Sequence, residues 1–422
     1  MTDLSVDARL LAPEQARSSQ LPSINRNVVG FGLAVLTAGA LALGEAYGWR
    51  QGTLFLLGGT LGLALYHALF GFTSAWRVFI ANGRGAGLRA QMLMLAAAAL
   101  LFFPALGHGT LFGQPVHGEY GAVGVSLLVG AFLFGLGMQL GGGCASGTLY
   151  TAGGGNTRML VTLAFFIVGS AFGAWHLPWW SAQPNIGKVS LIASWGWAPA
   201  LAVSLAGFAL IAAFTAWVER HRHGKLRSGV DTDRRGWTRF LHGPWPLLAG
   251  ALALALGNFA TLYLAGRPWG ITSAFALWGS KIFAALGVDV ASWGYWQSAD
   301  RAKALHDSVF ADITSIMDFG IILGALLASG LAGKFQPGWR VDGRSLIAAV
   351  LGGLMLGYGA RLAYGCNIGA YFSGISSSSL HGWVWLAAAF VGSVLGTYLR
   401  PLFGLSVERS LKRVQAAPAA RD

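Results

Sequence analysis

Ten long apolar segments, each close to the length that crosses a lipid bilayer, limit most strongly what this chain can fold into. A transmembrane helix takes roughly 20 consecutive, mainly apolar residues. We therefore expect an all-α polytopic membrane protein with about ten spans. The candidates lie at 28–48, 52–70, 88–107, 120–140, 157–177, 196–218, 245–265, 313–333, 345–363 and 382–404.

Composition points to the same class. Of the 422 residues, 55% are hydrophobic and 11% charged, whereas soluble globular proteins carry roughly 25% charged residues. So few charges are unable to cover a chain of this length in water. This excludes a soluble, disordered or disulfide-stapled protein, and argues against nucleic acid as a partner despite the net charge of +13. The lipid bilayer is the expected surrounding.

The distribution of Lys and Arg between the loops predicts the orientation, because these residues favour the cytoplasmic side. The connection 108–118 holds none, and 178–195 holds only Lys188. Both should face the side of the membrane opposite the cytoplasm, and both termini should be cytoplasmic. The loop 219–243 is strongly basic, which we interpret as a topology determinant rather than a binding patch. Its basic residues are Arg220, Arg222, Lys225, Arg227, Arg234, Arg235 and Arg239.

This orientation divides the chain into five parts. A polar cytoplasmic tail without a cleavable signal peptide precedes the first span, and a second cytoplasmic tail ends the chain. Between them, two halves of one membrane domain flank the basic cytoplasmic loop. The expected bounds are 1–27 for the first tail, 28–218 and 244–404 for the halves, 219–243 for the loop and 405–422 for the last tail.

The two halves contain a sequence repeat. The segment from Gly135 to Gly147 aligns without gaps onto the segment from Gly357 to Gly369, and the alignment pairs Cys144 with Cys366, the only two cysteines. An earlier element, Gly71-Phe-Thr-Ser-Ala, aligns onto Gly270-Ile-Thr-Ser-Ala. The two cysteine segments follow the fourth and ninth spans. Five spans separate them, so the copies should enter the membrane from opposite sides as an inverted repeat, a common plan in transporters.

Four apolar segments are too short to cross the bilayer and lie at corresponding places in the halves. Such glycine-broken segments are the usual sign of a transport site. We expect short re-entrant helices around a central Gly-Cys constriction. They lie near 72–82, 144–153, 271–285 and 366–376, and the polar stretch 289–311 reads as an insertion in the second half.

Each cysteine stands in a Gly-Cys-x-x-Gly element, Gly143 to Gly147 and Gly365 to Gly369. Glycine allows a sharp turn, and a helix that begins there directs free N–H groups toward an anion. A thiol is soft and polarisable. The pattern favours a site for an anionic, sulfur-like ligand. The alternative is that each cysteine is a small buried apolar residue.

These paired elements, GGGCASGTLY and YGCNIGA, resemble the YeeE/YedE family of bacterial inner-membrane sulfur-compound transporters over roughly residues 50–400. The resemblance implies thiosulfate-type uptake through an hourglass-shaped protein without a cofactor, with Cys144 and Cys366 as cysteines of the path. Thiosulfate-transporting members can carry a further cysteine in a Gly-Phe-Cys element, where this chain has Thr73 and Ser74. Some relatives are linked with selenium or with unassigned sulfur species.

Several polar residues accompany this path. Thr73, Ser74, Thr272, Ser273 and Asn367 can donate hydrogen bonds to an anion, although Ser and Thr in helices often bond to their own backbone. Arg361 occupies the position of Gln139 in the first half. It should either attract anions from the outer vestibule or form a buried ion pair with Asp318.

Other ionisable residues have simpler interpretations. Lys281 is a second cation or snorkels to the interface, and Glu45 is a candidate for a proton-coupled step. The histidines show no metal-ligand spacing and read as interfacial residues. They are His67, His108, His117 and His381.

The leading hypothesis is therefore an uptake transporter for thiosulfate or a related anion, not an enzyme, with a small cytoplasmic sulfur carrier as a further partner. The alternative is a membrane sulfurtransferase or redox protein whose cysteines carry a persulfide or disulfide. Such an enzyme needs a thiol activated by a neighbouring cation or helix start. No His or Lys adjoins either cysteine in the sequence.

The orientation can be tested by labelling single surface cysteines placed at Arg227 and Lys188. We expect a membrane-impermeant thiol reagent to reach position 188 from the periplasm and position 227 only after the inner membrane is opened. Labelling of both from one side would remove the odd number of spans between the copies, and with it the inverted repeat.

Overall fold

The computed structural model describes residues 23–227, 234–338 and 341–408, and in these parts it is almost entirely helical. It contains ten helical segments long and apolar enough to cross a membrane, which confirms the expected all-α polytopic fold. The long helices are α1 (Arg26–Tyr47), α2 (Trp49–His67), α4 (Ala86–His108), α5 (Val125–Gly141), α7 (Thr157–Ser181), α9 (Trp197–His223), α11 (Leu247–Ala265), α14 (Ile313–Leu331), α15 (Gly343–Leu362) and α17 (Leu380–Leu399).

Short helices follow four of the long ones, where the sequence predicts segments too short to span. They are α3 (Phe72–Asn82), α6 (Ala145–Gly153), α12 (Thr272–Ala285) and the π-helical η4 (Asn367–Ser373), which continues into α16 (Gly374–Ser376). A glycine or cysteine breaks the chain before three of them. Gly142 has a φ of 93° after α5, and Gly365 has a φ of 151° before η4; only glycine adopts such angles without strain.

Small elements fill the connections. Two antiparallel pairs, β1 (Thr110–Leu111) with β2 (Gln114–Pro115) and β3 (Ala122–Gly124) with β4 (Asn185–Lys188), lie in the loops without Lys or Arg clusters. The predicted insertion 289–311 folds into η2 (Val290–Ser292), η3 (Gly294–Trp296) and α13 (Ala299–His306). The remaining elements are α8 (Leu191–Trp195), α10 (Gly236–His242) and η5 (Arg400–Phe403).

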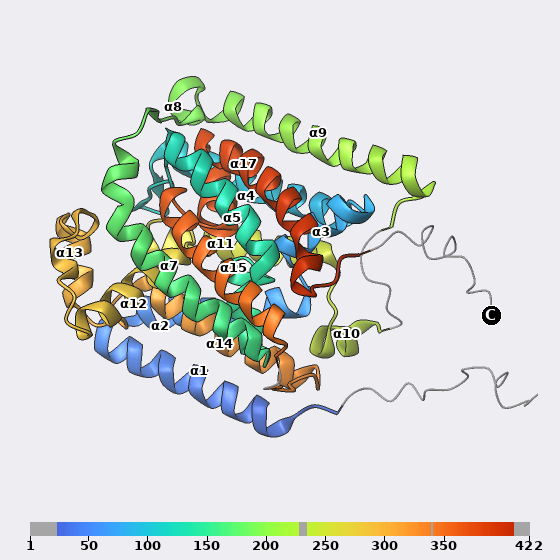
Figure 1. The fold of residues 1–422 in the computed structure, drawn as a ribbon, viewed down its shortest axis with the longest axis horizontal. Helices are drawn as coiled ribbons and strands as arrows, with labels where there is room; N and C mark the ends of the chain where they lie inside the picture. The colour runs from blue at the N-terminus through green and yellow to red at the C-terminus, as the bar shows by residue number, and fades with distance from the viewer. Residues whose placement is uncertain (1–22, 228–233, 339–340, 409–422) are drawn as a thin grey trace, which may run out of the picture.

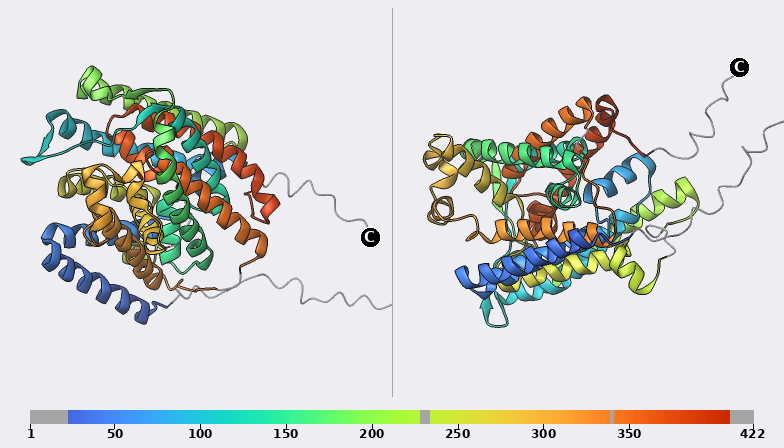
Figure 2. Two further views of the ribbon diagram at one scale, coloured as in Figure 1. Left: turned by 60° about the vertical axis from the view of Figure 1, so that its left-hand side comes forward. Right: turned by 90° about the horizontal axis from the view of Figure 1, so that it is seen from below.

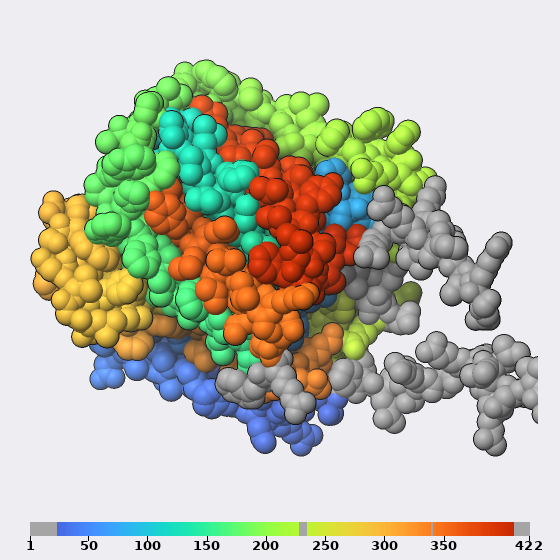
Figure 3. All heavy atoms as spheres, in the orientation of Figure 1, coloured from blue at the N-terminus to red at the C-terminus, as the bar shows by residue number. Residues whose placement is uncertain are grey.

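The packing of the central helices follows the sequence repeat. α15 of the second half packs along α7 of the first half, and α5 of the first half packs along α17 of the second half. Space-filling shows these four helices side by side on one face of the molecule (Figure 3). Two further long helices cover opposite edges of the bundle. α1 lies against α2 and α14 at one edge, and α9 lies against α4 at the other (Figures 1 and 2).

Equivalent atoms make equivalent contacts across the two halves. A Cβ atom at Gly135 would overlap the carbonyl oxygen of Ala389, and one at Gly357 would overlap that of Phe166. The Ser393 hydroxyl donates to the Gly135 carbonyl at 3.0 Å, and the Ser170 hydroxyl donates to the Gly357 carbonyl at 3.5 Å. Two copies of one helix pair therefore meet around a pseudo-two-fold axis.

The helices that carry this repeat run antiparallel to each other. Gly130 of α5 lies against Gly359 of α15, while Gly137, further along α5, lies against the earlier Gly352. Small residues at such crossings let helix backbones approach closely, which is how helices associate in lipid. The copies thus point in opposite directions, as an inverted repeat requires.

Some predicted features lie outside the described residues. These are most of the tail 1–27, residues 409–422 of the last tail and residues 228–233 of the basic loop. The division into two tails, two halves and a loop stays a prediction.

Candidate substrate path

The two Gly-Cys turns meet in the interior of the bundle. Cys144 is the residue before α6, Cys366 is the residue before η4, and these two short helices contact each other. Both side chains are free thiols, 1% and 0% exposed, and they lie close enough to interact electrostatically. The repeat therefore brings the only two sulfhydryl groups of the chain into one buried region.

Each thiol is held by a neighbour within its own turn. The Ile368 N–H donates to the Cys366 sulfur at 3.3 Å. The Cys144 sulfur lies 3.4 Å from the Ser146 hydroxyl, and the Thr148 hydroxyl closes the first turn of α6 by donating to the Cys144 carbonyl at 2.8 Å. Both sulfurs thus stand at helix starts.

Two glycines make these turns sterically possible. A Cβ atom at Gly143 would lie 3.0 Å from the Thr148 nitrogen, and one at Gly365 would lie 2.7 Å from the Ala370 nitrogen. The other two glycines of the elements leave space beside the turn. Around Gly147 the nearest atom to such a Cβ is the Cys144 sulfur at 3.5 Å. Around Gly369 it is the backbone carbonyl oxygen of Tyr364 at 4.0 Å.

The threonines of the aligned Thr-Ser elements lie beside the polar residues of the repeat. The Arg361 guanidinium donates to the Thr272 hydroxyl at 2.9 Å, and the Gln139 amide donates to the Thr73 carbonyl at 3.2 Å. Thr73 also lies beside the Cys144 thiol. Its hydroxyl has no hydrogen-bond partner among the described residues.

The neighbouring serines differ between the halves. The Ser74 hydroxyl donates to the Gly71 carbonyl at 3.2 Å, the backbone bond that Ser often makes in helices. The Ser273 hydroxyl instead donates to the Thr314 hydroxyl at 3.1 Å. Asn367 is fully buried, and within the described chain neither atom of its amide has a partner. Of these threonines, serines and the asparagine, the ones whose donors have no partner among the described residues are Thr73 and Asn367.

The predicted ion pair between Arg361 and Asp318 is wrong. The Arg361 guanidinium donates to the Tyr295 hydroxyl at 2.8 Å and to Thr272, and its centre lies 5.9 Å from the Tyr295 ring. Both carboxylate oxygens of Asp318 lack a partner in the described part of the chain. Equal depth in two helices does not place side chains on facing sides, and α15 packs mainly on α5 and α7 whereas α14 packs mainly on α2.

Arg361 instead lines a cavity of about 430 Å³ that ends at the Cys366 turn. Gly365 and Gly369 belong to its wall. Arg361 is 8% exposed, and its Nε has no partner among the described residues. The charged residues of the lining are three cations, Arg267, Arg301 and Arg361, and three carboxylates, Glu119, Asp300 and Asp312.

Two of these cations, Arg301 and Arg267, contact uncharged neighbours in the cavity wall. Arg301 stacks on the Tyr295 ring at 4.2 Å, and Arg267 donates to Thr314 at 2.9 Å. Burial raises the pKa of the Glu119 carboxyl, and the nearby guanidiniums of Arg267 and Arg361 offset only part of that rise. The Glu119 carboxyl therefore keeps its proton to a higher pH than an exposed glutamate does.

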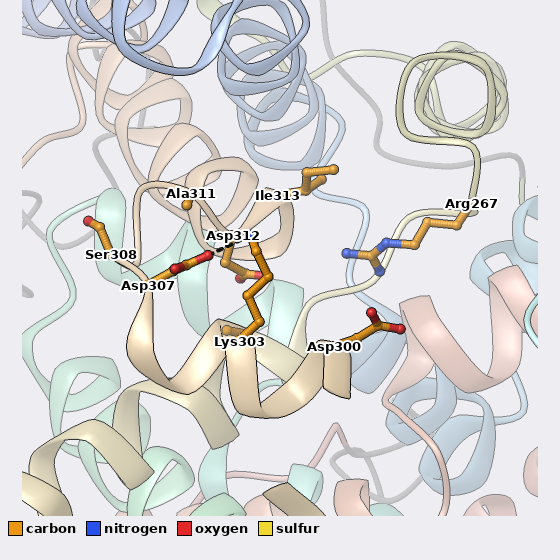
Figure 4. A pocket seen from close by; sticks show the side chains of 9 residues that line it. Arg267, Asp300, Lys303, Asp307, Ser308, Ala311, Asp312 and Ile313 are labelled. Atoms are coloured by element: carbon orange, nitrogen blue, oxygen red, sulfur yellow. Dashed lines mark hydrogen bonds and ion pairs between the residues drawn. The ribbon is translucent and has the colours of Figure 1, made fainter. Parts of the chain in front are cut away.

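A smaller pocket of about 210 Å³ adjoins this cavity on the side of α13. Figure 4 shows Arg267, Asp300 and Asp312 directed into one space, and the ion pair of Lys303 with Asp307 at 2.8 Å beside them. Because the two spaces share Arg267, Asp300 and Asp312, the inserted segment forms one wall of the mouth.

Sequence reasoning missed Glu119, Arg267, Tyr295 and Arg301. Each lies in a connection rather than in a repeated element, so only the folded chain brings them to the Arg361 cavity. The single available signal is a polar, charged insertion beside a candidate path.

The other ionisable residues lie apart from the path. Lys281 donates to the carbonyls of Leu305 and Asp307 at 2.7 and 2.6 Å, so it ties α12 to the inserted segment. Glu45 is exposed on α1. His67 and His381 are buried inside the protein, 2% and 0% exposed. In the described ranges, no group of His, Cys, Asp or Glu is arranged to hold a metal ion.

Comparison with known proteins matches this chain to a sulfur transport family and to transporters. A family model described as "Sulphur transport" matches residues 67–395. A protein named thiosulfate transporter TsuA, from Spirochaeta thermophila, is 28% identical over 82% of this chain and 96% of its own length. The probable transporter YedE of Escherichia coli is 31% identical over 43% of this chain. The match spans less than half of the YedE relatives, 45% of that protein and 40% of its Salmonella typhimurium counterpart.

The cavity geometry predicts that Arg361 binds anions. Loss of a charge-assisted hydrogen bond costs about 1.5–3 kcal/mol, so Arg361→Gln should weaken thiosulfate binding by roughly tenfold or more, as measured by titration calorimetry on purified protein. Lys303→Gln is the matched control, because Lys303 is 77% exposed and paired with Asp307. Equal affinity of Arg361→Gln and the parent would remove Arg361 from the path.

Proposed function

The chain belongs to the sulphur transport family of YeeE/YedE proteins, and from this premise we propose that it carries thiosulfate, or a closely related small sulfur anion, into the cell. The observation that carries this proposal is the position of the two free thiols. They stand at repeat-related turns, buried in the centre, below a cavity lined by three arginines. The proposed location is the bacterial inner membrane, with both termini cytoplasmic.

The first step is capture in the cavity beside Arg361. Cations in a concave surface raise the local concentration of anions. Here Arg267, Arg301 and Arg361 stand beside three carboxylates, of which Glu119 has a raised pKa. The Tyr295 and Thr272 hydroxyls orient the Arg361 guanidinium, which leaves its unpartnered Nε for an oxyanion. The opposite face has the neutral Gln139 at the equivalent position. This difference favours capture from the Arg361 side.

The second step is passage between the thiols. The terminal sulfur of thiosulfate is large and polarisable, and a thiol is a weak donor that can match it. Backbone N–H groups at the start of α6 can offset part of the desolvation of the charge. The contacts are noncovalent, so the anion is released without any reaction at sulfur.

The residues beside the constriction complete the proposed path. The unpartnered Thr73 hydroxyl lies next to Cys144, where related transporters carry the additional cysteine that the family resemblance implies. The amide of Asn367, next to Cys366, offers both a donor and an acceptor. Gly147 and Gly369 keep the space beside the two turns free of side chains.

The membrane potential opposes such uptake. Moving one elementary charge against 100 mV costs about 2.3 kcal/mol, so entry of a dianion into an inside-negative cell costs about twice that amount. Selective contacts lower the barrier to passage but supply no energy. By themselves they do not concentrate the anion inside the cell.

The function is tested by uptake of labelled thiosulfate into proteoliposomes with Cys144→Ser, Cys366→Ser and the double variant. Serine is close to cysteine in size but harder and less polarisable, so each variant should insert normally and lose most uptake. Ser329→Ala removes a buried hydroxyl that donates to the Leu326 carbonyl within α14, so it controls for loss of a small buried polar group and should retain most transport. Full uptake by the double variant would end a thiol-guided mechanism.

The same samples separate transport from the alternative, a membrane sulfurtransferase. Under the proposal, mass spectrometry of the protein after turnover finds no additional sulfur on Cys366. A persulfide that accumulates on Cys366 during uptake would favour the enzyme.

A further inference from the structure

Asp318 is the most unusual ionisable residue of the bundle. It lies in the second turn of α14, is 0% exposed, and in the described part of the chain neither carboxylate oxygen has a hydrogen-bond donor. The ion pairs found among the described residues do not include it. Nothing in the passage of an anion past the thiols uses this side chain.

Asp318 lies along the route from the cavity to the constriction. One turn before it, Thr314 accepts hydrogen bonds from Arg267 and Ser273, which line the cavity. One turn after it, the Ile322 carbonyl lies against Gly153 of α6, the helix that Cys144 begins. Residues four apart share one face of a helix. Asp318 therefore lies on the same face, between the mouth and the Cys144 helix.

The charges around Asp318 identify its partners. Its electrostatic neighbours are Cys366, on the path, and Asp312, at the start of its own helix. Groups on the other packed elements are engaged elsewhere. Lys281 of α12 binds carbonyls, Arg50 of α2 donates to Gln114, and the α1 carboxyl of Glu45 is exposed.

Two further groups complete the surroundings of α14. Tyr150 of α6 interacts with Cys144 and Tyr66, and His242 of α10 pairs with the Thr238 carbonyl at 3.2 Å. None of these contacts supplies a cation to Asp318. A bare carboxylate without donors is costly in such a place, so the side chain is held as the neutral acid. Intramembrane carboxyls of this kind typically serve proton relays.

From this placement we propose that Asp318 carries a proton inward with each substrate anion, which makes the protein a proton symporter. The inference rests on the proposed function, since it concerns how uptake of a sulfur dianion is coupled. The proton enters from the outer cavity along the Thr314 face and leaves toward the inner face beside α6. Each proton that moves with the anion removes one of the charges that the membrane potential opposes.

Proteoliposomes with the potential clamped at zero test this coupling. An inward gradient of one pH unit should raise thiosulfate accumulation about tenfold for each coupled proton. Asp318→Asn has the shape of the neutral acid and should fold, but its accumulation should not respond to the gradient. Asp318→Glu should respond, and Glu45→Gln, on the exposed face of α1, should behave as the parent.

Exchange of labelled for unlabelled thiosulfate separates the proposed transport from its proposed coupling to protons. Exchange needs the path but no net proton movement, so Asp318→Asn should retain it. A parent protein that exchanges thiosulfate but ignores the pH gradient would overturn the symport while leaving the proposed transport intact. An Asp318→Asn variant with the parent's gradient response would also overturn it, whereas loss of exchange in the parent would overturn the transport itself.

A second measurement needs no variant. A pH-sensitive dye trapped in the vesicles should report acidification of the lumen when thiosulfate is added outside. Entry of labelled thiosulfate without acidification would contradict the proposal.

Discussion

Direct contact between helix backbones is the constraint on which the rest of this structure depends. Lipid gives helices no hydrophobic reason to associate, so van der Waals packing of small residues must hold them together. At Gly135 and Gly357 even one methyl group would overlap a carbonyl of the neighbouring helix. The same contact, made twice, places the turns before α6 and η4 against each other. The two buried thiols therefore lie on short helices that contact each other.

This arrangement separates charge attraction from sulfur recognition. Arg267, Arg301 and Arg361 line the cavity, while the Cys144 and Cys366 turns offer thiols, amides and hydroxyls. Arg158 donates to the Leu140 and Gly141 carbonyls just before the Cys144 turn, so its guanidinium is already engaged there. In the proposed path, soft, neutral contacts in the centre select for sulfur and still permit release. In the proposed path, Arg361 and its uncharged counterpart Gln139 give the two faces of a symmetric fold different roles.

The sequence predicted the helices well and their lateral contacts poorly, for a physical reason. Bilayer thickness determines the length of an apolar segment, and the repeat locates the turns, so spans and Gly-Cys elements could be identified from the sequence. Which faces of the helices meet depends on rotation about each axis. That rotation separated Arg361 from Asp318 and buried His67 and His381. Tyr295 and Arg267 were missed because the connections that carry them show no periodic pattern.

Competition between anions tests the account most directly, because sulfate has the charge of thiosulfate but lacks its terminal sulfur. The measurement is initial uptake of labelled thiosulfate by the parent protein in proteoliposomes, with excess unlabelled thiosulfate, selenosulfate or sulfate outside. Recognition by thiols predicts strong inhibition by thiosulfate and selenosulfate and little by sulfate. Equal inhibition by sulfate would contradict it, since charge alone would then account for selection.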